Sequence, residues 1–184
     1  MGTQMNTIKQ HPLLVAFLLI VLAVVSRLLP HPPNVAPIAA VGLFSGVYVR
    51  NKFSFIVPIV SMLISDVFIG FYGPVMIAVY GSFALSVLIG RFLQNSPSRL
   101  KIIIGALLSS SIFFFITNLA VWYFGTMYTK DVSGLMTCFV AAVPFFRNTL
   151  LGDLFYTSTL FQLYSVLVGE QQRATRRIGN IASV

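Results

Sequence analysis

The stretch LLVAFLLIVLAVVSRLLPHPPNV, residues 13–35, contains the two features that decide the fold. Its first part is an apolar run whose first charge is Arg27, and as a helix this run is long enough to cross the hydrocarbon core of a bilayer. Its second part holds Pro30, Pro32 and Pro33, which prevent a helix from continuing and restrict the backbone of the loop. The stretch therefore predicts a membrane span over about residues 11–29 that ends in an ordered loop.

Further apolar runs follow along the rest of the chain. The predicted spans are about 35–49, 53–70, 75–92, 100–124 and 144–168, the last beginning at Pro144, with a basic tail over 169–184. Of the 184 residues, 57% are hydrophobic and 9% are charged, whereas a soluble domain has about 25% charged residues. We therefore expect a single-domain, all-α integral membrane bundle of about six transmembrane helices.

Lysine and arginine occur in alternate gaps between the apolar runs. Those before the first run and after the second, fourth and last are Lys9, Arg50, Lys52, Arg91, Arg99, Lys101, Arg173, Arg176 and Arg177. The intervening gaps hold only Lys130, beside Asp131. Because basic residues are retained on the cytoplasmic side, the pattern predicts a multipass protein of the plasma (bacterial inner) membrane with both termini in the cytoplasm.

The net charge of +8 is explained by contact between this basic side and anionic membrane lipids. Nucleic acid is not expected as a partner, because no soluble segment interleaves basic and aromatic residues.

Four charged residues and two asparagines fall within the predicted spans, in the half of the bilayer nearer the outside. They are Arg27, Asp66, Asn118, Arg147, Asn148 and Asp153. A charge at membrane depth costs roughly 2.5–3.5 kcal/mol on insertion scales, so such groups are either paired or functional. In one interpretation, an arginine pairs with an aspartate and pins the helices together. In the other, the six groups line a pocket open to the outside, and both can hold at once.

The pocket interpretation assigns a chemical task to each group. The arginines would meet an anionic group of a solute, the aspartates a donor or a cation, and the asparagines would form directed hydrogen bonds. The proline-containing loop would cover the pocket, and Trp122, Tyr123, Phe145 and Phe146 would stack on a flat ligand, although Trp122 and Tyr123 also suit interfacial anchors. The full predicted solute-binding set is Arg27, His31, Asn34, Asp66, Asn118, Trp122, Arg147, Asn148 and Asp153.

The second predicted span carries small residues at close helical spacing. Ala36, Ala40, Gly42 and Gly46 would allow a neighbouring helix to approach closely. Either burial within the bundle or a dimer face would use this property.

The sequence argues against an enzyme. It contains no HExxH, GxSxG, Walker A or GxGxxG pattern, and no cofactor is expected. The single cysteine, Cys138, cannot form an internal disulfide, and His11 and His31 fall on opposite sides of the membrane, so no metal site is predicted. An aspartyl dyad of Asp66 and Asp153 is disfavoured, because nearby arginines would keep both ionised.

Several blocks of the chain carry a family resemblance. They are RLLPHPPN at 27–34 with PIAA at 37–40, SD at 65–66 with GFY at 70–72, TN at 117–118 with Trp122, and AAVPFFRNTLLGD at 141–153. The chain resembles a family of six-span bacterial proteins described only as transport proteins, which is related to the substrate-binding S components of energy-coupling factor (ECF) transporters. The resemblance covers about residues 11–168, and its first and last blocks are the most specific.

The resemblance implies a six-helix protein that captures a small polar or zwitterionic solute, such as a vitamin-like micronutrient, in an outward-facing pocket for uptake. It also implies docking on a transmembrane coupling subunit that carries ATPases. S components often dock through Ala-x-x-x-Ala on the first span, but here Ala16 and Ala23 are seven residues apart, so another membrane protein as partner or solitary action is the alternative. A different class of function is a non-transporting structural or accessory subunit of a larger membrane complex.

Overall fold

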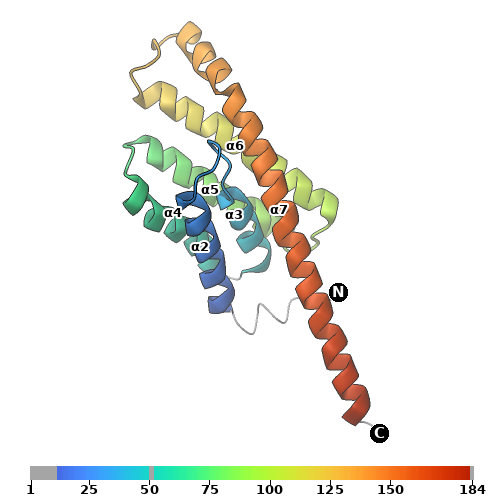
Figure 1. Ribbon diagram of the computed structural model, residues 1–184. Coiled ribbons are helices and arrows are strands. Elements are labelled where there is room, and N and C mark those ends of the chain that lie inside the picture. Colours follow the sequence, from blue (N-terminus) through green and yellow to red (C-terminus); the bar gives the residue numbers. More distant parts are fainter. Residues whose placement is uncertain (1–11, 50–51, 183–184) are drawn as a thin grey trace.

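The computed structural model describes residues 12–49 and 52–182, and these residues form six helices and no strand (Figure 1). The helices are α2 (Pro12–Leu28), α3 (Ile38–Tyr48), α4 (Phe53–Ile69), α5 (Val75–Leu93), α6 (Arg99–Phe124) and α7 (Val132–Ala182). The predicted all-α class is confirmed for the described residues.

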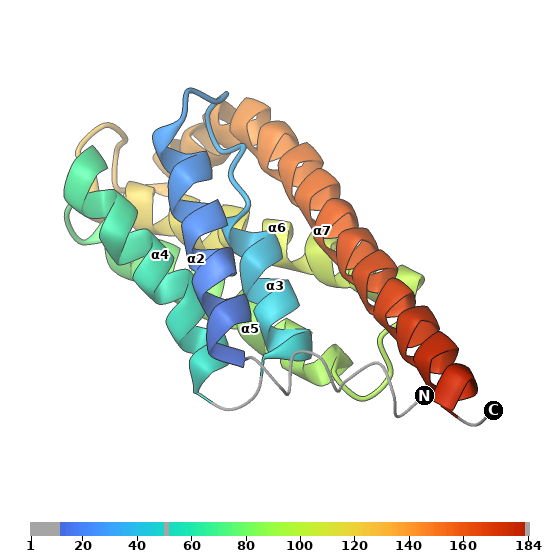
Figure 2. The ribbon, with the colours of Figure 1, turned by 60° about the horizontal axis from the view of Figure 1, so that its bottom comes forward.

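Consecutive helices run in roughly opposite directions (Figure 2). The loop between α2 and α3 therefore lies at one end of the bundle, which we call the proline-loop end. The link between α5 and α6 lies at the other, which we call the basic end because it carries Lys52, Arg91, Arg99 and Lys101.

Three helical segments are long and apolar enough to cross a membrane: α5, α6 and residues 132–168 of α7. The segment Leu13–Leu28, α3 and α4 are shorter apolar helices. The outer surface carries large apolar side chains; Phe17 of α2 is 61% exposed, Ile77 of α5 76% and Phe155 of α7 64%. Such a surface suits lipid better than water. The chain is therefore a multipass membrane protein, in agreement with its composition.

The short helix α3 lies at the centre of the bundle and packs against α4, α5, α6 and α7. Ten of its 11 residues are buried, as expected for a helix that is apolar on every side. Its glycines bring it close to α5, since a Cβ added to Gly46 would lie 2.9 Å from the Cα of Gly90. The prediction that the small residues of this segment are buried within the bundle is thus confirmed for Ala40, Gly42 and Gly46.

Four of the predicted spans agree with the described helices within one residue at each end, and two differ. The expectation that Pro144 starts a new helix is wrong, because α7 starts at Val132 and continues through this proline. A proline removes one intrahelical hydrogen bond and crowds the carbonyl four residues earlier, which is a local disturbance in a helix of 51 residues. The second span begins at Ile38 instead of residue 35, since a proline at position 37 disfavours helical backbone in the residue before it.

The predicted basic tail is helical as far as Ala182, within α7. Residues 1–11, 50–51 and 183–184 lie outside the described residues, and they include Lys9, His11 and Arg50. The predictions made for them stay predictions.

The close contact between α3 and α5 predicts a large effect of one added methyl group. In Gly46→Ala the new Cβ would meet backbone atoms of α5, which cannot rotate away as a side chain can, so the helices must separate. Overpacking of this kind costs about 1–3 kcal/mol. We expect a lower melting temperature of the detergent-solubilised protein in differential scanning fluorimetry.

Gly81→Ala is the matched control for this substitution. A Cβ at Gly81, also on α5, would have no atom within 4 Å. The control should leave the melting temperature unchanged or raise it, since alanine is favoured over glycine in helices by up to about 1 kcal/mol. Equal effects of the two substitutions would contradict the close contact.

Candidate functional site

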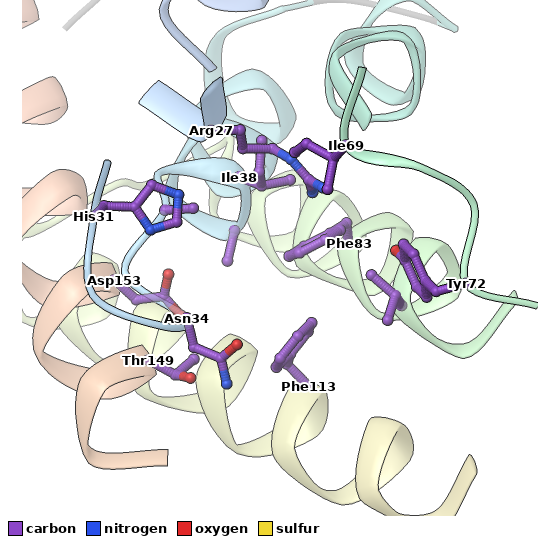
Figure 3. A pocket seen from close by; sticks show the side chains of 13 residues that line it. Arg27, His31, Asn34, Ile38, Ile69, Tyr72, Phe83, Phe113, Thr149 and Asp153 are labelled. Atoms are coloured by element: carbon purple, nitrogen blue, oxygen red, sulfur yellow. The ribbon is translucent and has the colours of Figure 1, made fainter. Parts of the chain in front are cut away.

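A cavity of about 470 Å³ lies at the proline-loop end of the bundle (Figure 3). Its apolar lining residues are Ala36, Ile38, Ala39, Ile69, Val79, Phe83 and Phe113. Its polar lining residues are Arg27, His31, Asn34, Tyr72, Thr149 and Asp153. A mostly apolar wall with a few polar groups, at this volume, is typical of small-molecule sites.

Arg27, near the end of α2, forms an ion pair with Asp66 of α4. Its Nη2 donates to Asp66 Oδ1 over 2.5 Å, and its Nη1 contacts the sulfur of Met62. The other carboxylate oxygen of Asp66 accepts a 2.7 Å hydrogen bond from the hydroxyl of Tyr80 on α5. Because Asp66 is fully buried, the guanidinium and the hydroxyl replace the water that its carboxylate has lost. One of the pairings that the sequence left open is therefore present, and it joins three helices.

Asp153 of α7 is 3% exposed and has a different environment. Its Oδ2 accepts a 2.6 Å hydrogen bond from the hydroxyl of Ser110 on α6. No lysine, arginine or histidine whose side chain the structure describes forms an ion pair with it. Thr149 and Thr157, one helical turn before and after it, are buried on the same face of α7. The cavity thus contains a carboxylate without a cationic partner among these side chains.

The loop between α2 and α3 is fixed to α7 at the mouth of the cavity. The side-chain amide of Asn148 donates to the carbonyl of Pro33 over 3.2 Å. Gly152 of α7 faces this loop, since a Cβ there would make an ordinary van der Waals contact, 3.4 Å from the Cα of Val35. Asn34 has a φ of 63°, a left-handed backbone that asparagine adopts more readily than most residues, and its side chain lines the cavity.

Tyr72, in the loop between α4 and α5, lies across the cavity from Asp153 in Figure 3. Burial, with a further contribution from the carboxylate of Asp66, raises the pKa of Tyr72 to about 12. Its hydroxyl is therefore protonated at physiological pH and can donate a hydrogen bond into the cavity.

A second cavity of about 210 Å³ adjoins the first. The residues that line both are Asn34, Val79, Phe113 and Thr149. Asn118 lines the smaller cavity, where its side-chain amide donates to the carbonyl of Phe114 over 2.7 Å. Phe145 and Phe146, two of the aromatic residues expected to stack on a ligand, line it as well.

The structure brings together only part of the predicted site. The larger cavity is lined by Arg27, His31, Asn34 and Asp153, and the smaller one by Asn118. Asp66 instead pairs with Arg27, and Asn148 donates a hydrogen bond to the α2–α3 loop. Arg147 is exposed and lines neither cavity, because a spacing of six residues places it about 120° away from Asp153 around α7. Trp122 also lines neither; its Nε1 donates to the carbonyl of Thr129 over 2.9 Å.

Several lining residues are missing from the predicted set. Thr149 precedes Asp153 by four residues, a helical spacing that identifies it as a neighbour on the same face. Phe83 and Phe113 have no such signal, since they are two of 17 phenylalanines in a chain where aromatic residues also face lipid. Tyr80 is likewise identified only by its contact with Asp66.

The ion pair predicts unequal effects of substitutions on its two sides. Asp66→Asn leaves the guanidinium of Arg27, which is 14% exposed, without its counter-charge, and removing one partner of a buried pair costs about 3–5 kcal/mol. Tyr80→Phe removes one hydrogen bond to a charged group, worth about 1.5–3 kcal/mol. In thermal unfolding, Asp66→Asn should therefore lower the melting temperature more than Tyr80→Phe does.

The double variant tests whether the two contacts act together. Tyr80→Phe should lower the melting temperature less in the Asp66→Asn background than in the native chain, since its charged acceptor is gone. Strict additivity of the two substitutions would contradict a shared carboxylate.

Comparison with known proteins gives a family but no characterised relative. No curated protein and no solved structure matches the chain. The model of a family of unknown function, DUF6580, matches residues 7–177. The chain therefore belongs to the DUF6580 family.

Proposed function

We propose that the protein binds a small polar or zwitterionic solute in the larger cavity, from outside the cell, and serves its uptake. The observation that carries this proposal is the cavity itself, an apolar space of about 470 Å³ into which a few polar groups from several segments project. A bundle held together only by its charges would have no need of such a space.

The direction of the cavity is inferred from the charges. Lys52, Arg91, Arg99 and Lys101 lie at the basic end, and the cavity lies at the opposite end. Basic residues stay on the cytoplasmic side, so the cavity would face outward in a bacterial inner membrane, with both termini inside.

The six described helices would all cross the membrane, including the shorter ones. With 11 residues, α3 spans only about 16 Å, and the loop before it would complete the crossing. Non-helical backbone is tolerated at membrane depth where it is covered by protein or lines a cavity, and this loop rests on α7.

A solute with groups of both signs fits the polar lining. Arg27 lines the cavity, so its guanidinium is the cationic group nearest to an acceptor on a ligand, and its Nε has no partner among the described residues. The carboxylate of Asp153 offers an acceptor elsewhere in the same cavity.

The resemblance to S components agrees with this use of the cavity. The two most specific blocks, 27–34 and 141–153, supply Arg27, His31, Asn34, Thr149 and Asp153 to its lining. Import against a gradient would need a partner with ATPases or a coupled ion, as the resemblance implies. The alternative of a structural subunit that docks through the small residues of α3 is weakened, because Gly42 and Gly46 are buried against α5.

The test is a thermal-shift screen of the purified protein against vitamins, nucleobases and amino acids. A compound that binds the folded state raises the melting temperature, by an amount equivalent to about 2.7 kcal/mol at a hundredfold excess over its Kd. The shift should disappear in Ala36→Leu, which adds bulk to the cavity wall at a partly buried position.

Ala141→Leu, the same substitution at an exposed position of α7, is the control and should keep the shift. If every stabilising compound acts equally on Ala36→Leu, binding lies elsewhere and the proposal fails. Stable co-purification with another membrane protein, without any ligand effect, would favour the structural subunit.

A further inference from the structure

We propose that the solute is an organic cation whose positively charged nitrogen pairs with Asp153 beside the aromatic lining of the cavity. This inference names the substrate class and rests on the function proposed above. It follows from three features of the larger cavity: its buried carboxylate, the commitment of its arginine, and its stacked phenylalanines.

The first feature is the missing counter-charge of Asp153. The side chain is 3% exposed, and its recorded hydrogen bond comes from the neutral hydroxyl of Ser110. A buried carboxylate is costly unless a cation accompanies it. Since Asp153 lines the cavity, a cation that enters the cavity can supply the missing charge.

The second feature is that neither arginine considered from the sequence pairs with Asp153. The guanidinium of Arg27 is paired with Asp66 at 2.5 Å, so the two charges offset each other. Arg147, the other arginine considered from the sequence, is exposed and outside the cavity. His31 is an exposed loop residue whose Nδ1 lies 2.9 Å from the carbonyl of Pro32. With Arg27 and Asp66 offsetting each other, the ionised form of the Asp153 carboxylate is left without a counter-charge among these groups.

The third feature is the aromatic lining. The rings of Phe83 and Phe113 stack with centroids 5.3 Å apart and an interplanar angle of 25°, and both line the cavity. In Figure 3 they lie between Asp153 on one side and Tyr72 on the other. Aromatic faces attract a cation and pack well on a flat ring, and both effects grow when water is excluded. A flat molecule with a cationic nitrogen satisfies the carboxylate and the rings together.

Three pyridines of similar size but different charge provide the test. They are 1-methylnicotinamide, a permanent cation, nicotinamide, which is neutral, and nicotinate, an anion. We expect the cation to bind the full-length detergent-solubilised protein at least about tenfold more tightly than either other compound in thermal-shift titrations, as suits one buried charge-assisted contact. Nicotinamide or nicotinate binding as well as the cation, or no binding of the cation at millimolar concentration, overturns the inference.

Two isosteric substitutions locate the effect. Asp153→Asn keeps the side-chain shape and an acceptor for Ser110 but removes the charge, so the preference for the cation should be lost. Asp131→Asn makes the same change in an exposed loop carboxylate outside the cavity and should preserve it. A preference that survives Asp153→Asn overturns the inference; if that variant does not fold, the ranking of the three pyridines by the native protein decides.

The remaining outcomes separate this inference from the proposed function. In one outcome, sodium chloride stabilises the protein more than choline chloride does, and Asp153→Asn abolishes this difference. That result would show that the carboxylate binds an inorganic cation, and it would overturn the proposal of an organic cation. If the protein binds nicotinate as tightly as the cation and Ala36→Leu abolishes this binding, the proposal of a cationic solute also fails. The proposed solute-binding cavity would remain supported. Only loss of all cavity-dependent binding would remove both.

Discussion

The packing of α3 is the constraint on which the rest of the structure depends. This helix has 11 residues, ten of them buried, and through Gly46 and Gly90 it approaches α5 more closely than larger side chains permit. Because it is shorter than its neighbours, the space above its first turn is filled by the α2–α3 loop and by the cavity, which Ala36, Ile38 and Ala39 help to line. The cavity is thus a consequence of a central helix that begins late, and proline at position 37 sets that beginning.

The two buried aspartates show how one kind of residue serves two purposes. Asp66 is enclosed by Arg27 and Tyr80 from two other helices, so its charge is matched and its hydrogen bonds are made within the protein. Asp153 has a hydroxyl from Ser110 and a face on the cavity. A paired carboxylate stabilises the arrangement of helices, whereas one that lacks a described cationic partner carries an energetic cost that a ligand can relieve. The two aspartates carry the same charge and differ in their surroundings, which the sequence does not reveal.

Helix positions could be predicted from the sequence because hydrophobic runs and proline act locally, and α2, α4, α5 and α6 agree within one residue. The start of α7 could not be predicted in this way, because the packing on both sides of a proline decides whether it breaks a helix or only disturbs it. For the site, the cost of charge in a membrane drew attention to Arg27 and Asp153, and both line the larger cavity. Depth in the membrane is not a sufficient criterion for a cavity residue, as Arg147 shows. Arg147 lies less than two helical turns from Asp153, but it points to a different side of α7. Phe83 and Phe113 required the tertiary structure, because nothing local distinguishes a cavity phenylalanine from one that faces lipid.

The packing towards the basic end bears on how a solute could cross. Below the cavity, α3 and α7 meet through an aromatic cluster in which Phe44 and Phe161 lie 5.2 Å apart and Tyr48 and Tyr164 lie 4.1 Å apart. Phe44 and Phe161 are buried, so a solute could not continue along this contact unless the rings separated. Breaking such a cluster forfeits several aromatic contacts of about 0.5–1.5 kcal/mol each, in addition to the apolar area exposed. Under the uptake function proposed above, this contact between α3 and α7 therefore argues against a pore that continues from the cavity through the aromatic cluster.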